Sequence, residues 1–237
     1  INYNPETVST DYDESDRLFF DEINLETVIE IYQKEKPLGL IIAMGGQIPN
    51  NLAMHLKRAG LKILGTDPSD IDRCEDRNKF SALLDSLDAD QPEWVEARSL
   101  KEVVEFANRV QYPVLVRPSY VLSGAAMGVA TSDAVLQKFL ANAEEISPEY
   151  PVVISKFLEN AKEIELDAVA HHGELVTIAI SEHVENAGVH SGDATLVLPP
   201  QRTYLETMRR IKVITQKVAR SLKIHGPFNI QFIAKDN

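Results

Sequence analysis

Cysteine is nearly absent from this chain, since Cys74 is the one thiol in 237 residues. A lone thiol excludes the internal disulfide framework of small secreted domains and is compatible with a reducing compartment. No apolar run approaches the roughly 20 residues that a membrane-spanning helix needs. Positive charge is also scarce, because 24 Lys and Arg against 36 Asp and Glu give a formal net charge of −12. This balance argues against general affinity for DNA, RNA or anionic membranes, although local basic residues can still hold an anionic small molecule.

The two ends of the sequence predict a piece of a longer polypeptide. The chain enters at Ile1-Asn2-Tyr3 without a methionine or a signal peptide. It stops at Asp236-Asn237, a turn signal after which a returning hairpin strand is expected. Its 237 residues suffice for one large domain or two modest ones with a sizeable core.

Helix and strand signals alternate over the first part of the chain. Apolar residues at helical spacing predict helices over 25–32 and about 49–59, and short apolar runs predict strands at 40–44 and 62–65. Such alternation favours a parallel sheet covered by helices. We therefore expect a partial Rossmann-like α/β region over residues 1–73.

The remainder, 74–237, is predicted as a larger unit of the α+β class. Ser99 and Glu102 form a capping box for a helix over 100–110, and Thr203 with Glu206 is expected to start the last long helix in the same way. The other expected elements are helices at 69–73 and 76–87, a helix capped by Ser132 that carries Val135, Phe139 and Leu140, and strands at 113–117, 127–131, from 151 and at 228–234. A hairpin of 162–170 and 174–183 with its turn at His172-Gly173 is also expected.

The loop that follows Arg117 carries the strongest functional signal. An apolar strand delivers this guanidinium into the small-residue segment 119–126. Backbone N–H groups in such a loop can approach a phosphate closely, and Arg adds a fork of donors matched to phosphate oxygens. Two interpretations stay open on local evidence, a phosphate-binding loop and a buried Arg followed by an ordinary loop.

Polar residues follow two further patterns. Glu163, Glu165 and Asp167 alternate with apolar residues, so the three acids face one side of a strand, which is either a solvated sheet face or the wall of a nucleotide pocket. The segment 181–193 is dense in polar groups and is predicted to be a long functional loop. Its spacing fits no zinc template, but a histidine near a phosphate can donate a hydrogen bond or act in acid–base chemistry.

Two isolated polar residues complete the set. Arg77 stands at a predicted helix start, where an acid would suit the helix dipole better, and a surface ion pair is the alternative to a functional role. Gln231 lies between Ile230 and Phe232 in a strand, so its amide needs a partner on the opposite face, either a side chain or a ligand.

Taken in order along the chain, the motifs closely resemble the large (synthetase) subunit of carbamoyl phosphate synthetase, an ATP-grasp enzyme. The form of the Arg117 loop resembles the second, carbamate-phosphorylating half of that subunit, in its eukaryotic branch. The resemblance covers essentially all 237 residues, and it rests on residues 4–13, Gly45-Gly46-Gln47, Glu75-Asp76-Arg77, Arg117-Pro118-Ser119-Tyr120-Val121-Leu122-Ser123-Gly124, Glu182-His183-Val184-Glu185 and Gly188-Val189-His190-Ser191-Gly192-Asp193.

The resemblance implies a role for each matching position. Arg77, Arg117 and His190 would act on the ATP phosphates and the transferring phosphoryl group, and loop 119–126 would close over them as a lid. The other nucleotide contacts would come from Ser155, Lys156 and Leu158 at the adenine and from Glu163 at the ribose. Gly188, Val189 and Ser191 would complete the nucleotide and phosphate contacts.

The implied cofactors are ATP, Mg²⁺ or Mn²⁺, and K⁺. Gln231 resembles the first of the divalent-metal ligands. Glu163, His183, Glu185 and Val189 resemble a cradle for a monovalent cation. The chain departs from the bacterial pattern there, because Ala194 stands where a serine is found, and this puts K⁺ binding in doubt.

The implied activity is ATP-dependent phosphorylation of carbamate to carbamoyl phosphate, for either pyrimidine or arginine (or urea) synthesis. The implied partners are a glutaminase subunit or fused glutaminase domain and the first synthetase half of the same polypeptide, without nucleic acid or membrane. The compartment would be the cytoplasm, or the mitochondrion if the pathway requires it. The resemblance also implies that residues 1–73 are a partial pre-ATP-grasp region and that residues 74–237 are an ATP-grasp domain lacking its C-terminal part. The family's Glu-x-Asn metal motif is expected beyond residue 237, so the isolated chain is expected to be inactive.

Two alternatives remain. One is another ATP-grasp ligase such as a biotin-dependent carboxylase, although such enzymes usually begin the phosphate loop from a Lys and carry more glycines than the segment after Arg117. The other is a non-catalytic nucleotide-binding or assembly module that keeps the fold without the activity.

Overall fold

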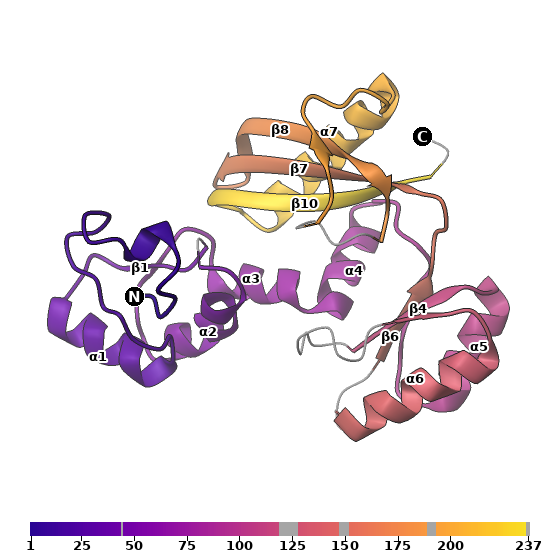
Figure 1. Cartoon of the computed structure of the whole chain (residues 1–237), viewed down its shortest axis with the longest axis horizontal. Coiled ribbons are helices and arrows are strands. Elements are labelled where there is room, and N and C mark those ends of the chain that lie inside the picture. The colour runs from indigo at the N-terminus through magenta and orange to yellow at the C-terminus, as the bar shows by residue number, and fades with distance from the viewer. Residues whose placement is uncertain (44, 119–127, 147–151, 189–192, 236–237) are drawn as a thin grey trace.

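The computed structural model describes residues 1–43, 45–118, 128–146, 152–188 and 193–235. Three lobes are visible in Figure 1: an N-terminal lobe, a middle lobe at the lower right and a C-terminal lobe at the top. In the described ranges, no helix combines the length and the apolarity needed to cross a membrane.

The N-terminal lobe is a small α/β unit, as the alternating signals predict. Strands β1 and β2 are parallel, and helices α1 and α2 supply much of its core, which contains Val28, Ile42, Ala53 and Leu56. Its elements are η1 (Val8–Thr10), α1 (Leu25–Glu35), β1 (Leu40–Ile41), α2 (Gln47–Arg58) and β2 (Ile63–Leu64).

Two short helices, α3 (Pro68–Glu75) and α4 (Arg77–Ser86), connect this lobe to the others (Figure 1). Asp67 caps α3 by accepting from Ser69 N–H, and Asp76 caps α4 by accepting from Lys79 N–H. Because Asp76 is extended, the chain breaks between the helices, and Arg77 becomes the first residue of α4.

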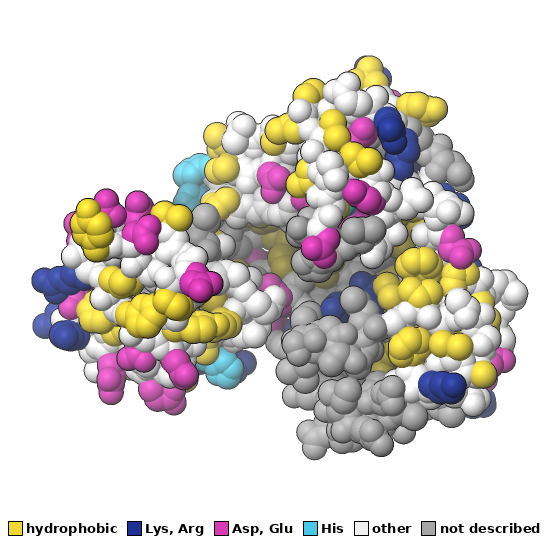
Figure 2. Space-filling view, viewed as in Figure 1, with side chains coloured by type: hydrophobic (Ala, Val, Ile, Leu, Met, Phe, Trp, Pro, Cys, Tyr) yellow, Lys and Arg dark blue, Asp and Glu magenta, His cyan; other side chains and the backbone are white. Residues whose placement is uncertain are grey.

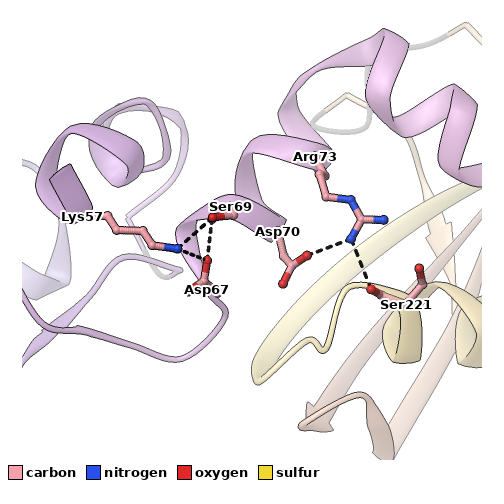
Figure 3. Close-up of polar contacts among 6 residues, drawn as sticks. All are labelled: Lys57, Asp67, Ser69, Asp70, Arg73 and Ser221. Atoms are coloured by element: carbon pink, nitrogen blue, oxygen red, sulfur yellow. Dashed lines mark hydrogen bonds and ion pairs between the residues drawn. The ribbon is translucent and has the colours of Figure 1, made fainter.

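Polar contacts fix α3 at both ends (Figure 3). Lys57 Nζ of α2 donates to Asp67 Oδ1 at 2.7 Å and to Ser69 Oγ at 2.8 Å. Arg73 Nη1 donates to Asp70 Oδ1 at 2.9 Å and to the Ser221 carbonyl at 3.3 Å. The helix is therefore anchored to the N-terminal lobe on one side and to the C-terminal lobe on the other.

The middle lobe is an antiparallel sheet of order β3-β6-β4-β5 with helices α5 and α6 packed against it. Ser99 caps α5 as predicted, since its side chain accepts from Glu102 N–H. The second bond of the predicted capping box differs, because the Glu102 carboxylate accepts from Arg98 N–H. Strand β3 is not among the predicted elements, because its short half-buried sequence shows no alternation. The elements are β3 (Trp94–Ala97), α5 (Leu100–Val110), β4 (Val114–Pro118), β5 (Gly128–Ala130), α6 (Asp133–Ile146) and β6 (Val152–Lys156).

The C-terminal lobe is an antiparallel sheet of order β10-β7-β8-β9. Its apolar face, which includes Ile164, Leu166 and Ile180, packs with Ile211 of α7. Helix α4 also belongs to this lobe, because its Leu83 packs in one cluster with apolar residues of the sheet and of α7. The elements are β7 (Lys162–His171), β8 (Glu174–Asn186), β9 (Leu196–Val197), α7 (Leu205–Ser221) and β10 (Gly226–Ala234).

Two sequence predictions in this lobe are wrong. The polar segment from Ser181 does not begin a loop, because β8 continues to Asn186 and pairs with β7 and β9. The predicted capping box of α7 does not form either. Tyr204 is the N-cap residue without a side-chain cap bond, and Thr203 Oγ1 instead donates to Glu182 Oε2 at 2.7 Å.

Glu182 anchors the segment before α7. Glu182 is only 4% exposed, and its carboxylate also accepts from Gln201 N–H and Arg202 N–H at 2.9 Å each. Burial alone raises the pKa of Glu182, but the bonds from Thr203, Gln201 and Arg202 outweigh burial and lower it. The carboxylate therefore contributes stability above its unfolded-state pKa, and this stability is lost as the pH falls through the lower folded-state pKa.

Glu182→Gln should destabilise the chain by about 2 kcal/mol at pH 7. The amide has one acceptor oxygen in place of two, and its NH₂ group would face the donors of residues 201–203 without an acceptor. Urea unfolding measures the loss, which should shrink as the pH falls below the unfolded-state pKa of Glu182 and through its lower folded-state pKa. Glu174→Gln is the control, since Glu174 is exposed and pairs only at the surface with Arg220. Equal losses in both variants would contradict the anchoring role.

Candidate functional site

Arg77 and Arg117 approach each other from two lobes. Arg77 begins α4, which packs in the C-terminal lobe, whereas Arg117 lies on β4 of the middle lobe, opposite Val153 of β6. Burial, with a smaller contribution from the positive charge of Arg77, lowers the pKa of Arg117 to about 10. Since like charges perturb one another measurably only at short range, the two guanidinium groups share one region of the molecule.

Both guanidinium groups are partly removed from water next to a like charge, which is unfavourable, and a bound anion would offset this. Burial also lowers the pKa of Arg77, and Glu75 offsets only part of that shift. Arg117 Nε is buried without a hydrogen-bond partner among the described residues. Both groups stay charged at pH 7, and Lys and Arg side chains are visible in the hollow between the middle and C-terminal lobes (Figure 2). The arrangement suits a phosphate-bearing ligand.

The Gly45-Gly46-Gln47 motif helps to position Arg77. Gln47 Nε2 and Asn50 Nδ2 donate to the two carboxylate oxygens of Glu75, at 2.8 and 2.9 Å. Glu75 ends α3 two residues before Arg77. The start of α2 is thereby linked through one carboxylate to the end of α3, directly before α4 begins.

The second part of the site is the polar face of the C-terminal sheet, which consists of Glu163, Glu165, Asp167, His183, Asn229 and Gln231. Glu165 Oε1 lies 3.0 Å from His183 Nε2 and accepts from Gln231 Nε2 at 3.0 Å. Asp167 Oδ1 accepts from Asn229 Nδ2 at 2.9 Å. Because Glu165 is only 7% exposed, the interpretation of a fully solvated acidic face does not hold.

Glu165 is a functional candidate that sequence reasoning did not single out. The signal was available in the strict alternation of Glu163, Glu165 and Asp167, but the central role of one acid depends on the cross-strand neighbours. Ligand atoms of Glu163, Glu165 and His183 lie within 4.8 Å of one another, a spacing that can hold a cation.

The expected monovalent-cation set is only partly brought together. Glu185 accepts from Thr195 N–H at 2.9 Å, and this bond lowers the pKa of Glu185. The structure thus groups Glu165, rather than Glu185, with Glu163 and His183. Gly188 is described and has a φ of +109°, whereas Val189, His190, Ser191 and the predicted lid 119–126 lie outside the described residues.

The expected adenine segment lies at the end of β6. Ser155 is buried, and the N–H groups of Lys156 and Phe157 donate to the carbonyls of Glu93 and Pro113 at 2.8 and 3.1 Å. Lys156 Nζ donates to the Gln111 and Tyr112 carbonyls at 2.9 and 3.2 Å, so its ammonium group braces the strand. Among the described residues, none accepts from Leu158 N–H, which leaves this donor for a ligand.

Two family models match the chain. Residues 1–73 match the carbamoyl phosphate synthase preATP-grasp domain, and residues 76–237 match the ATP binding domain of the carbamoyl-phosphate synthase L chain. The chain is 61% identical over 237 residues to multifunctional protein URA2 of Saccharomyces cerevisiae and 59% identical over 235 residues to the carbamoyl phosphate synthase arginine-specific large chain of Cutaneotrichosporon cutaneum. These matches cover 100% and 99% of the chain but only 11% and 20% of those proteins.

Solved structures agree on the fold. The biotin carboxylase domain of Hydrogenobacter thermophilus 2-oxoglutarate carboxylase, in complex with MgADP, ADP and bicarbonate, is similar with a TM-score of 0.77 at 16% identity, over 99% of this chain and 55% of that one. A D-alanine–D-alanine ligase of Bacillus anthracis complexed with ATP is similar with a TM-score of 0.67 at 16% identity, over 90% of this chain and 69% of that one. At this identity the likeness establishes the fold alone, which is the predicted ATP-grasp fold with a pre-ATP-grasp region before it.

The two family models together span nearly all of the chain, and the second alone covers more than half of it. The biotin carboxylase alternative has support only from the fold. The chain therefore belongs to the carbamoyl phosphate synthase large-chain family.

Proposed function

We propose that this chain binds Mg²⁺-ATP and takes part in the phosphorylation of carbamate to carbamoyl phosphate. The observation that carries the proposal is the Arg117 guanidinium at the end of β4, whose buried Nε has no hydrogen-bond partner among the described residues. Burial and the nearby positive charge of Arg77 both lower the pKa of Arg117. A triphosphate supplies negative charge beside both guanidinium groups and an acceptor for the buried Arg117 Nε. Family membership and the names of the relatives make carbamate the substrate that fits best.

Each part of the site has a task in this proposal. The two guanidinium groups hold the phosphates and neutralise charge on the phosphoryl group as it passes from ATP to a carbamate oxygen. Glu163 accepts from ribose hydroxyls, and Leu158 N–H donates to the adenine ring. Gln231 uses its amide N–H for Glu165, so its carbonyl oxygen is left for a divalent cation. When bound, Mg²⁺ would neutralise charge between adjacent phosphates.

A monovalent cation such as K⁺ is proposed at Glu163 and His183. The carboxylate oxygens suit such a hard cation better than the ring nitrogen does, and Glu165 is the extra oxygen donor that the structure adds to the expected set. Glu185 and Val189 would contribute from the adjoining segment, with His190 and Ser191 completing the phosphate contacts.

The proposed partners follow from the relatives. The relatives include a multifunctional protein and an arginine-specific synthase, so both pyrimidine and arginine synthesis remain candidate pathways. We propose that a glutaminase, fused or separate, and a first synthetase half work with this chain. The compartment follows the pathway: the cytoplasm for pyrimidine synthesis, and a mitochondrial place for an arginine-specific enzyme like that of Schizosaccharomyces pombe.

A segment exchange tests the catalytic proposal. The matching 235 residues of the Cutaneotrichosporon cutaneum large chain are replaced by this chain, which is 59% identical there. The hybrid should form ATP from carbamoyl phosphate and ADP, the reverse of the proposed step. A folded hybrid that binds nucleotide but forms no ATP would support the non-catalytic module instead.

Glu165→Gln tests the role of the polar face. Since Glu165 orients both His183 and Gln231, its neutralisation should raise the Mg²⁺ concentration needed for half-maximal ATP binding by about tenfold, as losses of outer-shell partners do. The measurement is a nucleotide titration at several Mg²⁺ concentrations. Glu174→Gln is the matched control, because Glu174 is exposed and pairs with Arg220 of α7, outside this polar face. An unchanged Mg²⁺ requirement in Glu165→Gln would remove this residue from the site.

A further inference from the structure

Three histidines meet where the C-terminal lobe approaches the N-terminal lobe. His171 and His172 lie at the turn between β7 and β8, and His225 directly precedes β10. Their ring centroids are 4.5 Å (171 to 172), 4.9 Å (171 to 225) and 4.3 Å (172 to 225) apart. Figure 2 shows a group of histidine side chains at this edge. One ring nitrogen of each residue lies within 4.8 Å of the other two.

The backbone holds these residues firmly. His172 and Gly173 both have positive φ, +48° and +87°, as a two-residue hairpin turn requires. Gly173 N–H donates to the Ile224 carbonyl at 2.8 Å, and the Gly173 carbonyl accepts from Gln216 Nε2 at 2.9 Å. His225 N–H donates to Thr66 Oγ1 at 3.0 Å. The turn and the segment before β10 are therefore fixed relative to each other.

Ring stacking alone does not explain the cluster. An aromatic contact contributes roughly 0.5–1.5 kcal/mol, and it would satisfy none of the ring nitrogens. His225 Nδ1 is buried and has no hydrogen-bond partner among the described residues. In the described ranges, no ion pair involves any of the three rings. A ligand with affinity for several imidazole nitrogens would account for both observations.

We propose that His171, His172 and His225 bind a divalent transition-metal ion of the Zn²⁺ class. Neutral imidazole is a preferred ligand of Zn²⁺, and three histidines with one water complete its tetrahedral coordination. Ligand nitrogens in such a site lie about 3.4 Å apart for Zn–N bonds of about 2.05 Å. The ring nitrogens lie within 4.8 Å of one another, and the exposed His171 and His172 side chains would rotate to reach the shorter separation.

This site is separate from the proposed nucleotide site. His171 ends β7, and Glu163 lies near its other end, eight residues away and roughly 26 Å along the strand. A bound ion would tie the β7–β8 turn to the segment between α7 and β10, next to Thr66 of the N-terminal lobe. Its direct effect is therefore on stability, independent of nucleotide.

Calorimetric titration of the 237-residue chain with Zn²⁺ tests the proposal. One Zn²⁺ should bind per chain, and Co²⁺ in its place should show the visible absorption of a tetrahedral complex. His172→Asn keeps a residue that tolerates the left-handed conformation, so the fold is preserved and circular dichroism checks it. This variant should raise the Zn²⁺ dissociation constant more than about tenfold, since even the loss of an outer-shell partner costs that much.

His55→Asn is the control, because His55 is an exposed histidine on α2, far from the cluster in sequence. The Zn²⁺ dissociation constant of this variant should match that of the wild type. A second readout is the urea midpoint, which Zn²⁺ should raise in the wild type and in His55→Asn but not in His172→Asn. Absence of stoichiometric binding would overturn the proposal. So would binding that His172→Asn retains and Glu165→Gln abolishes, which would assign the ion to the acidic cluster of β7.

Discussion

Replacing Arg117 by methionine is expected to weaken Mg²⁺-ATP binding at least about 100-fold while leaving stability against urea unchanged or increased. The guanidinium should make two or more charge-assisted hydrogen bonds to phosphate, each contributing about 1.5–3 kcal/mol. Two such bonds correspond to a change of 100-fold or more in the dissociation constant. In the free chain the same group is desolvated next to another cation, which is why its pKa falls to about 10. Methionine removes that unfavourable charge and keeps most of the apolar volume.

Isothermal titration with Mg²⁺-ATP and urea unfolding measure the two effects side by side. Arg58→Met provides the control, because Arg58 is exposed at the end of α2 and both quantities should stay at wild-type values. The Mg²⁺-ATP affinity of Arg117→Lys should lie between those of the wild type and Arg117→Met, since lysine retains the charge but lacks the planar fork of donors. If Arg117→Met unfolded easily and still bound ATP normally, Arg117 would be a structural residue and the phosphate assignment would fail.

The second large effect is expected at the β7–β8 turn, where Gly173→Ala should destabilise the chain by about 3 kcal/mol. Alanine at φ +87° costs about 1 kcal/mol by itself. An added Cβ would also lie 2.8 Å from Arg220 Cα and 3.0 Å from the Ala219 carbonyl oxygen. These are backbone atoms of α7, which cannot move away without shifting the helix, so the clash adds to the conformational strain.

Gly60→Ala separates the two contributions. Gly60 has a similar φ of +80°, but no atom lies within 4 Å of its added Cβ, so only the strain of about 1 kcal/mol is expected. Both variants are compared by urea unfolding at pH 7. Equal losses would show that the turn does not pack against α7 as described.

Local sequence signals predicted many of the elements. The Ser99 cap and the His172-Gly173 turn depend on short-range chemistry, whereas the parallel pairing of β1 with β2 follows from the alternation of helix and strand signals. The structure confirms all three. The extension of β8 to Asn186 was missed because a run of polar residues is typical of a loop. Its strand conformation depends on pairing with β7 and β9, which the local sequence does not reveal. The true partner of Thr203 was missed for the same reason, since Glu182 lies on another element.

The candidate site shows the same division. The alternation of Glu163, Glu165 and Asp167 predicted one acidic face, and the structure confirms it. That Glu165 is the shared partner of His183 and Gln231 depends on the strand register, which the sequence does not specify. The meeting of Arg77 and Arg117 depends on how α4 and β4 are placed in different lobes, and only the family resemblance could anticipate it.

A crystal structure of the chain with Mg²⁺ and a non-hydrolysable ATP analogue tests the convergence of Arg77 and Arg117 most directly. We expect both guanidinium groups within hydrogen-bonding distance of one triphosphate, with the adenine beside Leu158 and the ribose beside Glu163. A triphosphate that contacts neither arginine, or a nucleotide bound away from the junction of the middle and C-terminal lobes, would contradict the proposed function.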